Sequence, residues 1–330
     1  MNYKNILITG GAGFIGSNLA MEIQNRFPFS NITIFDKFNN GLKRTNYHYA
    51  FFGDYRNLID FKGTIISGDL TSDSDMSKLL NFNFDIIFHQ AAISDTTVTN
   101  QEEVLKTNSN TFNHFLNYVK ENSCKLIYAS SAGTYGNSLS PNIVGHGEVP
   151  ENVYGFSKLS MDNMTRIFLK TNPSKHVIGL RYFNVYGPGE LYKRKTSSMI
   201  LQLIGQILDK NKVRIFKFGE QSRDFVYIKD VVQANLKAID GRSGIYNIGY
   251  GQTRSFNDIV KILSECFNRE IEIEYFDNPY SFYQNNTCAD ISGSIVSFGY
   301  NPEYSLEKGI QDYFQEIIQY NPRQWASFYE

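Results

Sequence analysis

From Lys4 to about Arg181 the chain alternates short apolar runs with longer amphipathic segments. Each short run is apolar at nearly every position instead of alternating apolar and polar residues, which is typical of strands buried on both faces of a sheet. Six runs predict strands, at residues 6–9, 32–35, 64–67, 86–89, 126–130 and 177–181. Strands that alternate with helical segments in this way predict a parallel sheet with helices on both faces.

After Tyr182 the pattern changes to a helical run near residues 198–208, a strand-like run at 213–218 and mixed short elements out to Tyr275. No repeat, low-complexity tract or proline-rich linker separates the two regions, so we expect the chain to cross between them. We therefore predict an α/β protein with a doubly wound parallel sheet and a smaller, discontinuous α/β substrate-binding domain. The predicted boundaries are 1–182 for the sheet domain, with returns near 224–248 and 285–298, then 183–223, 249–284 and 299–320 for the smaller domain, and 321–330 for a tail.

A glycine-rich turn follows the first predicted strand and leads into a helical pattern that ends near Arg26. It satisfies Gly-x-Gly-x-x-Gly and contains Gly10, Gly11, Gly13 and Gly16. Such a turn lets a pyrophosphate approach the backbone and meets its charge with the N–H groups of a helix N-terminus. Asp36 ends the second strand 20 residues after Gly16, where an acidic side chain binds a ribose hydroxyl. A glycine turn without a ligand is the alternative, but the combined strand, helix and acid favour a Rossmann-like dinucleotide site.

The residues alone leave the choice between NAD and NADP open. Asp36 favours a free ribose 2′-hydroxyl, whereas nearby cations could bind a 2′-phosphate or could simply be solvated. These cations are Lys37, Lys43, Arg44 and Arg56. The ends of the third and fourth strands predict further cofactor contacts at Asp69, Leu70, Gln90, Ala91, Ala92 and, just beyond, Ser94.

The fifth strand and the helical pattern after it carry a set of polar residues that suits proton transfer. Ser131 ends the strand, and Tyr154 and Lys158 lie four residues apart, on one face of the predicted helix. A free phenol has a pKa near 10, and we expect a neighbouring ammonium to lower that pKa enough for exchange of a proton with a substrate hydroxyl. A half-buried Tyr with a solvated Lys is the plainer interpretation, but the glycine turn and Ser131 favour catalysis.

Composition and charge exclude several other classes. Among 330 residues, 32 Lys and Arg balance 33 Asp and Glu, so no net field would hold nucleic acid or an anionic membrane surface. Three distant cysteines and five histidines without metal-ligand spacing predict neither disulfides nor a metal site. Polar residues interrupt every apolar run before about 18 residues, so we expect neither a membrane span nor a signal peptide. A reducing cytoplasm fits the isolated cysteines.

Several stretches together carry a family resemblance across nearly the whole chain, except the final dozen residues. They are HQAAISDTT at 89–97, YASSAGTYG at 128–136, VYGFSK at 153–158, RYFNVYGPGE at 181–190 and RDFVYIKDV at 223–231. The chain resembles extended short-chain dehydrogenases/reductases that act on nucleotide sugars, and among them the ADP-L-glycero-D-manno-heptose 6-epimerases. That family interconverts the D-glycero and L-glycero forms of ADP-heptose, a precursor of the lipopolysaccharide core. The resemblance implies an isomerase, bound NADP with NAD as the second choice, and a homo-oligomer.

The resemblance implies two catalytic bases, Tyr154 and Lys193. Lys158 would hold the cofactor ribose and Ser131 the substrate oxygen. Two bases suit the reaction, because inversion at one carbon removes hydride from one face and returns it to the other. From the residues alone, Lys193 and its basic neighbours are better explained as a solvated loop or a diphosphate clamp.

The resemblance also implies a wider set of binding residues. Cofactor contacts would be Phe14, Ile15, Asp36, Lys37, Lys43, Asn108, Tyr154, Lys158, Val185 and Lys193. Substrate contacts would be Ser131, Asn184, Lys195, Gln202, Phe216, Gly219, Arg223 and Tyr283. For Arg223 the fork of the guanidinium also suits a diphosphate, with an ion pair to Asp224 or Asp230 as the alternative.

Two positions depart from the family pattern. Gly189 replaces the usual Arg, and Gln202 stands where a substrate-contacting His is found. After Ser131 the chain lacks the Asp-Glu pair of nucleotide-sugar dehydratases, which disfavours dehydration. Two other functions stay open: a 4-epimerase or net oxidoreductase on another nucleotide sugar, which would not need Lys193, and a cofactor-sensing protein without catalysis. The intact Tyr-x-x-x-Lys motif argues against a sensor.

Overall fold

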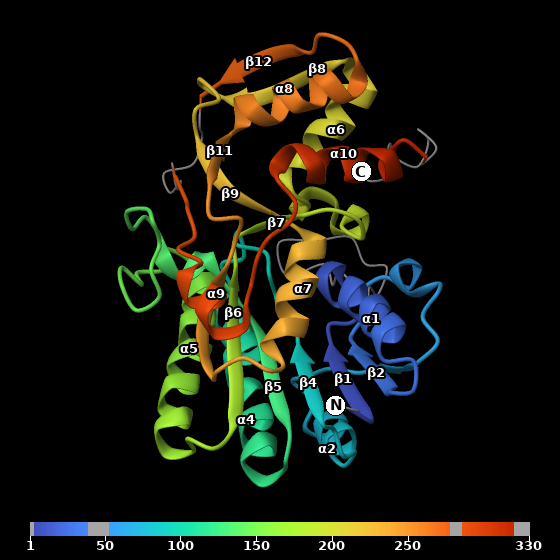
Figure 1. Cartoon of the computed structure of the whole chain (residues 1–330), viewed down its shortest axis with the longest axis vertical. Helices are drawn as coiled ribbons and strands as arrows, with labels where there is room; N and C mark the ends of the chain where they lie inside the picture. Colours follow the sequence, from blue (N-terminus) through green and yellow to red (C-terminus); the bar gives the residue numbers. More distant parts are fainter. Residues whose placement is uncertain (1–2, 39–52, 278–285, 320–330) are drawn as a thin grey trace.

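The large sheet is the main element of the computed structural model, which describes residues 3–38, 53–277 and 286–319 (Figure 1). It is parallel, with the strand order β10-β6-β5-β4-β1-β2-β3. The strands are β1 Asn5–Thr9, β2 Asn31–Asp36, β3 Thr64–Ser67, β4 Ile86–His89, β5 Lys125–Ser131, β6 His176–Tyr182 and β10 Gly244–Ile248. The six predicted strands are all confirmed, and the seventh, β10, comes from the second half of the chain.

Side chains of the central strands alternate between two buried clusters, one on each face of the sheet. Ile6 and Ile8 of β1 belong to one cluster, and Leu7 between them belongs to the other. Two helices, α1 (Phe14–Arg26) and α7 (Ile228–Ala238), supply apolar residues to the first cluster. Three others supply the second: α2 (Asp73–Leu80), α4 (Phe112–Glu121) and α5 (Val153–Thr171). Burial on both faces explains why these strands read as continuous apolar runs.

The three predicted helical patterns, after the glycine turn, from Tyr154 and near residues 198–208, are confirmed among the helices of the described residues. These helices are α1 Phe14–Arg26, α2 Asp73–Leu80, α3 Gln101–Val104, α4 Phe112–Glu121, α5 Val153–Thr171, α6 Met199–Lys210, α7 Ile228–Ala238, α8 Phe256–Phe267, α9 Ser292–Phe298 and α10 Leu306–Ile317. Asn152 caps α5 by accepting a hydrogen bond from the N–H of Gly155, which sets where this helix begins. Among the residues described, no helix is both long and apolar enough to cross a bilayer.

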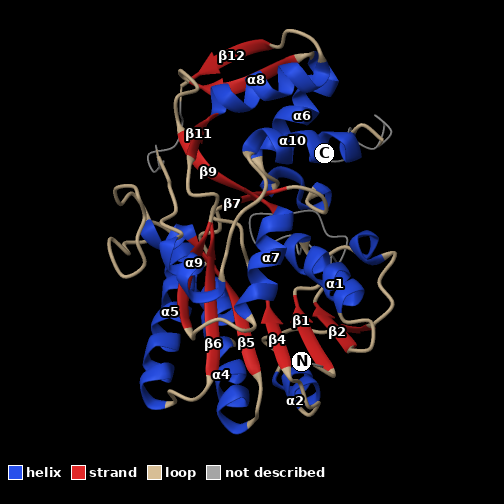
Figure 2. Cartoon of the chain, in the orientation of Figure 1, coloured by secondary structure: helices blue, strands red, loops and turns tan. Residues whose placement is uncertain are grey.

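A smaller region lies at one end of the large sheet, beyond the ends of its strands (Figure 2). It contains a three-stranded sheet, β11-β9-β7, and a two-stranded sheet, β12-β8. Their bounds are β7 Asn184–Tyr186, β8 Lys212–Phe216, β9 Ser222–Tyr227, β11 Thr253–Ser255 and β12 Glu272–Phe276. Helices α6, α8 and α10 accompany these strands, while α7 and β10 return to the large sheet, so the chain crosses between the regions as expected.

Candidate active site

A cavity of about 580 Å³ opens at the carboxyl ends of the large sheet's strands, where the smaller region meets it. The glycine turn, the ends of β2, β4, β5 and β6, and the start of α6 all contribute to its wall. Crevices at this edge of a doubly wound sheet are the usual ligand sites of such folds. The cavity therefore brings together residues from both regions.

The glycine turn is shaped for close approach by a ligand. Gly10 has φ +68, and a side chain on Gly16 would place its Cβ 2.1 Å from the Gly10 carbonyl oxygen. Gly13 precedes the first turn of α1 and offers no side chain to cap it, which leaves the helix N–H groups facing the cavity that Gly13 and Gly16 line. A dinucleotide pyrophosphate fits this cradle. Gly11 instead packs beneath the turn against Ile34.

Asp36 lies at the end of β2, where an adenosine ribose would be bound. Its carboxylate accepts hydrogen bonds from the N–H groups of Ala12 (2.9 Å) and Phe38 (2.9 Å). Burial raises the pKa of Asp36, against these hydrogen bonds, which lower it. The carboxylate is thus held in place on the cavity wall, as a ribose ligand needs.

Two of the predicted cations near this ribose, Lys37 and Arg56, have acidic partners, whereas Lys43 and Arg44 lie outside the described residues. Lys37 Nζ lies 2.6 Å from Asp69 Oδ2. The Arg56 guanidinium binds Asp54 through Nε and Nη2, both at 2.8 Å, and lies 3.9 Å from the Tyr192 ring centroid. Both side chains are thus paired with carboxylates, and neither pairing indicates a site for a 2′-phosphate.

Ser131, Tyr154 and Lys158 line the inner wall of the cavity. Lys158 is almost fully buried, its Nζ donates a 2.7 Å hydrogen bond to the Ala129 carbonyl, and it lies 5.9 Å from the Tyr154 ring centroid. Burial lowers the pKa of Lys158 to about 8, although Asp162 raises it. Burial also raises the pKa of Tyr154, and a hydrogen bond with Ser131 lowers it in part. The sequence predicted that Lys158 lowers the Tyr154 pKa; instead desolvation of the phenol raises this pKa, and the group that opposes the rise is Ser131.

Lys193 faces the same cavity from the smaller region. It lies on a short 3₁₀ helix, Leu191–Thr196, and its Nζ is 5.4 Å from the Phe14 ring centroid. Burial lowers the pKa of Lys193, and the charge of Glu190 raises it. The two predicted bases therefore come from different elements and meet at one cavity.

The substrate side of the cavity carries Asn184 and Arg223. Asn184 donates a hydrogen bond to the Asp224 carbonyl, and Arg223 Nη1 donates one to the Ser222 carbonyl. The carboxylates of Asp224 and Asp230 accept hydrogen bonds from backbone N–H groups. Arg223 is nine-tenths buried, so a ligand diphosphate would meet a largely desolvated guanidinium.

Residues 6–249 match the sequence profile of the NAD dependent epimerase/dehydratase family. The chain belongs to this family. The ADP-L-glycero-D-manno-heptose-6-epimerase of Brachyspira hyodysenteriae is 34% identical over 321 residues, which cover 94% of this chain and 97% of that protein. The crystal structure of Helicobacter pylori ADP-L-glycero-D-manno-heptose-6-epimerase has 48% identity and a TM-score of 0.88, covering 97% and 98% of the two chains. The UDP-N-acetylglucosamine 4-epimerase of Methanobrevibacter ruminantium, at 27% identity, has a TM-score of 0.84 over 97% and 99%.

These relatives confirm the family resemblance drawn from the motif stretches. Membership of the epimerase/dehydratase family makes the chain an enzyme that uses a nicotinamide cofactor. The glycine turn agrees, since a Cβ at Gly16 would collide with the Gly10 carbonyl and prevent the tight strand-to-helix turn that a pyrophosphate site needs.

Other residues predicted to contact ligands in this epimerase fold divide into three groups. On the cavity wall, besides those already placed there, are Phe14, Ile15, Asp69, Leu70, Gln90, Ala91, Ala92, Ser94 and Val185. Away from it are Gly11, Asn108, Gln202, Phe216 and Gly219. Lys43 and Tyr283 lie outside the described residues, as does the side chain of Lys195.

Three of the residues away from the wall, Asn108, Gln202 and Phe216, contact other parts of the protein. The Asn108 side chain exchanges hydrogen bonds with the backbone of Ile93 and donates one to Ser157 Oγ, so its polar atoms are used inside the protein. Gln202 donates to the Ser197 carbonyl, and the Phe216 ring packs on Phe276 at 4.9 Å. These three residues do not line the cavity, so the structure does not support the prediction that they contact the ligand directly.

The sequence patterns missed several residues that the structure places in or behind the site of this epimerase-family enzyme. Asp95, Thr107, Ser197 and Ser198 line the cavity. Asp162 and Glu190 are fully buried carboxylates behind it. Asp162 could have been found from spacing, because it follows Lys158 by one helical turn; Glu190 has no such pattern.

Proposed function

We propose that this enzyme is an ADP-L-glycero-D-manno-heptose 6-epimerase that inverts C6 of ADP-D-glycero-D-manno-heptose. The observation that carries the proposal is the pair of proton-transfer groups, Tyr154 and Lys193, on different elements of one cavity. The extensive similarity to the Helicobacter pylori and Brachyspira hyodysenteriae enzymes supports the choice of sugar and nucleotide. The product would serve lipopolysaccharide core synthesis.

Within this proposal each residue has a defined task. Tyr154 takes the proton of the C6 hydroxyl, and Ser131 holds that oxygen by a hydrogen bond. A bound nicotinamide supplies the acceptor and the donor of hydride. Lys193 serves as the second proton-transfer group, so that the C6 oxygen meets a proton donor in either orientation of the side chain. Arg223 binds the diphosphate.

We propose NADP as the cofactor, with NAD as the second choice. The family resemblance favours NADP. Asp36 favours NAD, as does the pairing of Lys37 and Arg56 with carboxylates of the protein. Mass spectrometry of the nucleotide released from freshly purified protein distinguishes the two, because they differ by one phosphate.

We also propose the division into domains given by the sequence, a homo-oligomer and a cytoplasmic location. The placement of β10 within the large sheet supports the return of the chain to the first domain. The free cysteines Cys124, Cys266 and Cys288 support a reducing compartment. Light scattering coupled to size exclusion measures the oligomeric state directly.

Proton NMR of ADP-D-glycero-D-manno-heptose in deuterated buffer, without added cofactor, tests the activity. We expect the two C6 epimers to approach equilibrium with no deuterium at C6, since hydride is returned from retained cofactor. An unchanged substrate after addition of NAD or NADP would reject the heptose assignment. UDP-sugars, tried under the same conditions, would then test a 4-epimerase.

A further inference from the structure

Asp162 lies behind the cavity wall that Ser131, Tyr154 and Lys158 form. It is on the buried face of α5, one turn after Lys158. Its Oδ1 accepts a 2.7 Å hydrogen bond from the Tyr128 hydroxyl. Its Oδ2 accepts hydrogen bonds from Ser130 Oγ (3.0 Å) and Arg181 Nε (2.8 Å), and Arg181 Nη2 lies 2.7 Å away. Asp162 and Arg181 are both fully buried. One carboxylate thus joins α5 to two neighbouring strands, β5 and β6.

The fold makes room for this carboxylate and its partners. A side chain at Gly179 of β6 would place its Cβ 2.4 Å from the Tyr128 hydroxyl oxygen. Glycine at this position therefore leaves space for the phenol that reaches Asp162. Removing any one donor would leave a buried charge short of partners, so we regard the arrangement as specific.

Two adjacent contacts tie the end of β5 to α5. Lys158 Nζ donates to the Ala129 carbonyl, and Ser130 Oγ donates to Asp162. Ser131 is the next residue of the strand. Both serines line the cavity, and because side chains alternate along a strand, the Ser131 side chain lies on the opposite face to that of Ser130. The position of Ser131 against Tyr154 therefore depends on the tie through Asp162.

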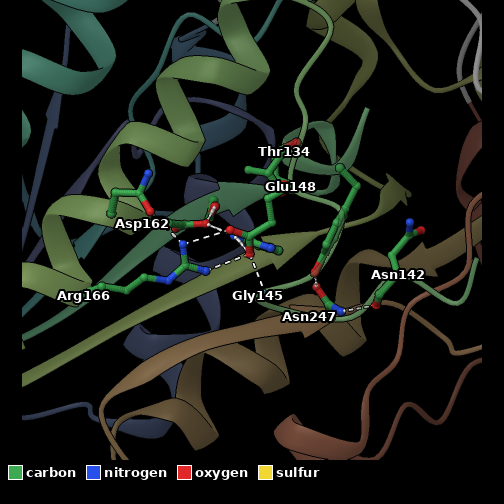
Figure 3. A network of polar contacts seen from close by, with 12 residues as sticks. Thr134, Asn142, Gly145, Glu148, Asp162, Arg166 and Asn247 are labelled. Carbon is green, nitrogen blue, oxygen red and sulfur yellow. Dashed lines mark hydrogen bonds and ion pairs between the residues drawn. The ribbon is translucent and has the colours of Figure 1, made fainter. Parts of the chain in front are cut away.

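A second layer of charges surrounds Asp162 (Figure 3). Arg181 Nη2 lies 2.7 Å from Glu148 Oε1, and Arg166 binds both oxygens of Glu148, at 2.7 and 2.9 Å. The Tyr135 ring lies 4.9 Å from the Arg181 guanidinium carbon. Together with Lys158, three cations face two carboxylates. The cluster therefore has a net charge of plus one. Lys158 is its cation nearest the cavity, and a phenolate at Tyr154 would balance that charge.

We propose that Asp162 is a positioning residue for the epimerisation, which fixes the Ser130–Ser131 strand end and keeps Lys158 charged beside Tyr154. This inference rests on the proposed function. It assigns to the buried cluster the task of presenting one cation and one hydroxyl to the reacting oxygen.

The electrostatics of Lys158 agree with this role. Burial lowers its pKa, the charge of Asp162 opposes that fall, and the two together leave the pKa at about 8. Without the carboxylate the ammonium would lose its proton within the neutral range. The groups that face or surround Lys158 are Tyr154 and Asp162 on α5, His89 on β4, Arg181 and Tyr182 on β6, and Lys193 across the cavity. Burial, with a smaller effect from Lys158, lowers the pKa of His89 to about 3, and burial raises that of Tyr182, so both stay neutral.

Competitive acetylation with acetic anhydride, followed peptide by peptide by mass spectrometry, tests the charge of Lys158 without any substrate. Only the neutral amine reacts, so the pH midpoint of labelling reports the pKa. We expect a midpoint near 8 in the wild-type holoenzyme and at least about one unit lower in Asp162→Asn. An unchanged midpoint overturns the proposal. If Asp162→Asn does not fold, a wild-type midpoint below about 7 overturns it equally, because Asp162 would then not be keeping the ammonium charged.

The rate profile against pH tests the consequence for catalysis. In Asp162→Asn we expect the alkaline limb of kcat to move to lower pH with the labelling midpoint, and Asp162→Glu to restore it. Glu148→Gln is the matched control, since it converts a carboxylate of the same cluster to an amide but leaves Asp162 charged, and its limb should stay in place. A limb that shifts equally in both variants overturns the specific role of Asp162.

Ser130→Ala tests the positional tie, because it removes a donor to Asp162 without changing any charge. We expect kcat to fall roughly tenfold, with KM and the alkaline limb unchanged. A wild-type kcat overturns this part of the proposal. Absence of turnover by wild-type protein would reject the proposed function instead, while the labelling midpoints would still decide the charge of Lys158.

Discussion

The two walls of the cavity hold their proton-transfer groups in different ways. Tyr154 lies on the first turn of a nineteen-residue helix, α5, which packs on the sheet and is tied to β5 through Lys158 and Asp162. Lys193 lies on a six-residue 3₁₀ helix, Leu191–Thr196. One wall is therefore built from long regular elements, and the other from a short irregular segment.

A single buried carboxylate organises the irregular wall. Glu190 accepts hydrogen bonds from the N–H of Gly187 (3.2 Å) and from both the N–H (2.5 Å) and the hydroxyl (2.7 Å) of Ser198. Gly187 precedes Lys193 and Ser198 follows it, so Glu190 holds together the two ends of the segment that carries Lys193. The regular wall thus depends on helix periodicity, whereas the irregular wall depends on one side chain.

The largest expected effect is that of Tyr154→Phe, which removes the proton-transfer group of the regular wall. We expect kcat to fall roughly 10²–10⁴-fold, since that is the usual contribution of a positioned acid or base. Tyr118→Phe, which removes a buried hydroxyl of α4 away from the cavity, is the matched control and should keep its activity. Steady-state epimerisation followed by NMR measures both, and comparable rates in the two variants would exclude Tyr154 as a base.

Lys193→Met tests the irregular wall. We expect turnover to fall roughly 10²–10³-fold with the cofactor still bound, because a proton donor is lost while the glycine turn is intact. Lys210→Met, at a largely exposed position on α6, is the control. Turnover near that of wild type would contradict the two-base mechanism and would favour an enzyme that relies on Tyr154 alone.

Glu190→Gln tests whether one carboxylate holds the irregular wall without affecting the regular one. We expect kcat to fall about tenfold and the free energy of unfolding to fall by about 1–3 kcal/mol, because an amide cannot satisfy three donors as a carboxylate does. The acetylation midpoint of Lys193 should move to lower pH, since Glu190 raises its pKa, and that of Lys158 should stay unchanged. A shift at both lysines would show that the walls are electrostatically coupled.

Glu148→Gln has the smallest expected effect on activity and acts on stability. Against burial, the hydrogen bonds of Arg166 and the charge of Arg181 lower the pKa of Glu148 from 4.5 to about 2. A carboxyl with a lowered folded-state pKa stabilises the protein above its unfolded pKa, and this contribution is lost as the pH falls toward 2. We expect the variant to lose up to about 3 kcal/mol at pH 7 and clearly less at pH 3, measured by urea unfolding at both values. An equal loss at both pH values would contradict the assigned ion pairs.

The regular wall was largely predictable from the sequence. The position of Ser131 at a strand end and the four-residue spacing of Tyr154 and Lys158 follow from periodicities of two and 3.6 residues. The same reasoning reaches Asp162, one further turn along α5, although the pattern alone does not indicate the donors it meets on β5 and β6. Those donors come from residues about 20 to 35 positions away.

The irregular wall was not predictable in the same way. Local composition placed Lys193 among solvated cations, and only family resemblance indicated a role for it. In the structure Lys193 lies beside Phe14, because Glu190 binds both ends of the segment that carries Lys193 and the smaller region packs on the glycine turn. Contacts between segments some 180 residues apart have no local signal.

Local sequence patterns were enough to predict the strands of the large sheet, the glycine turn and the Tyr-x-x-x-Lys face, because each pattern is imposed by backbone geometry and burial. Only the tertiary structure decided which carboxylates face which cations, which predicted residues line the cavity and which lie behind it. The physical reason is that desolvation and charge pairing depend on distances across the fold. Such distances are set when the two regions pack together, and the order of residues along the chain does not encode them locally.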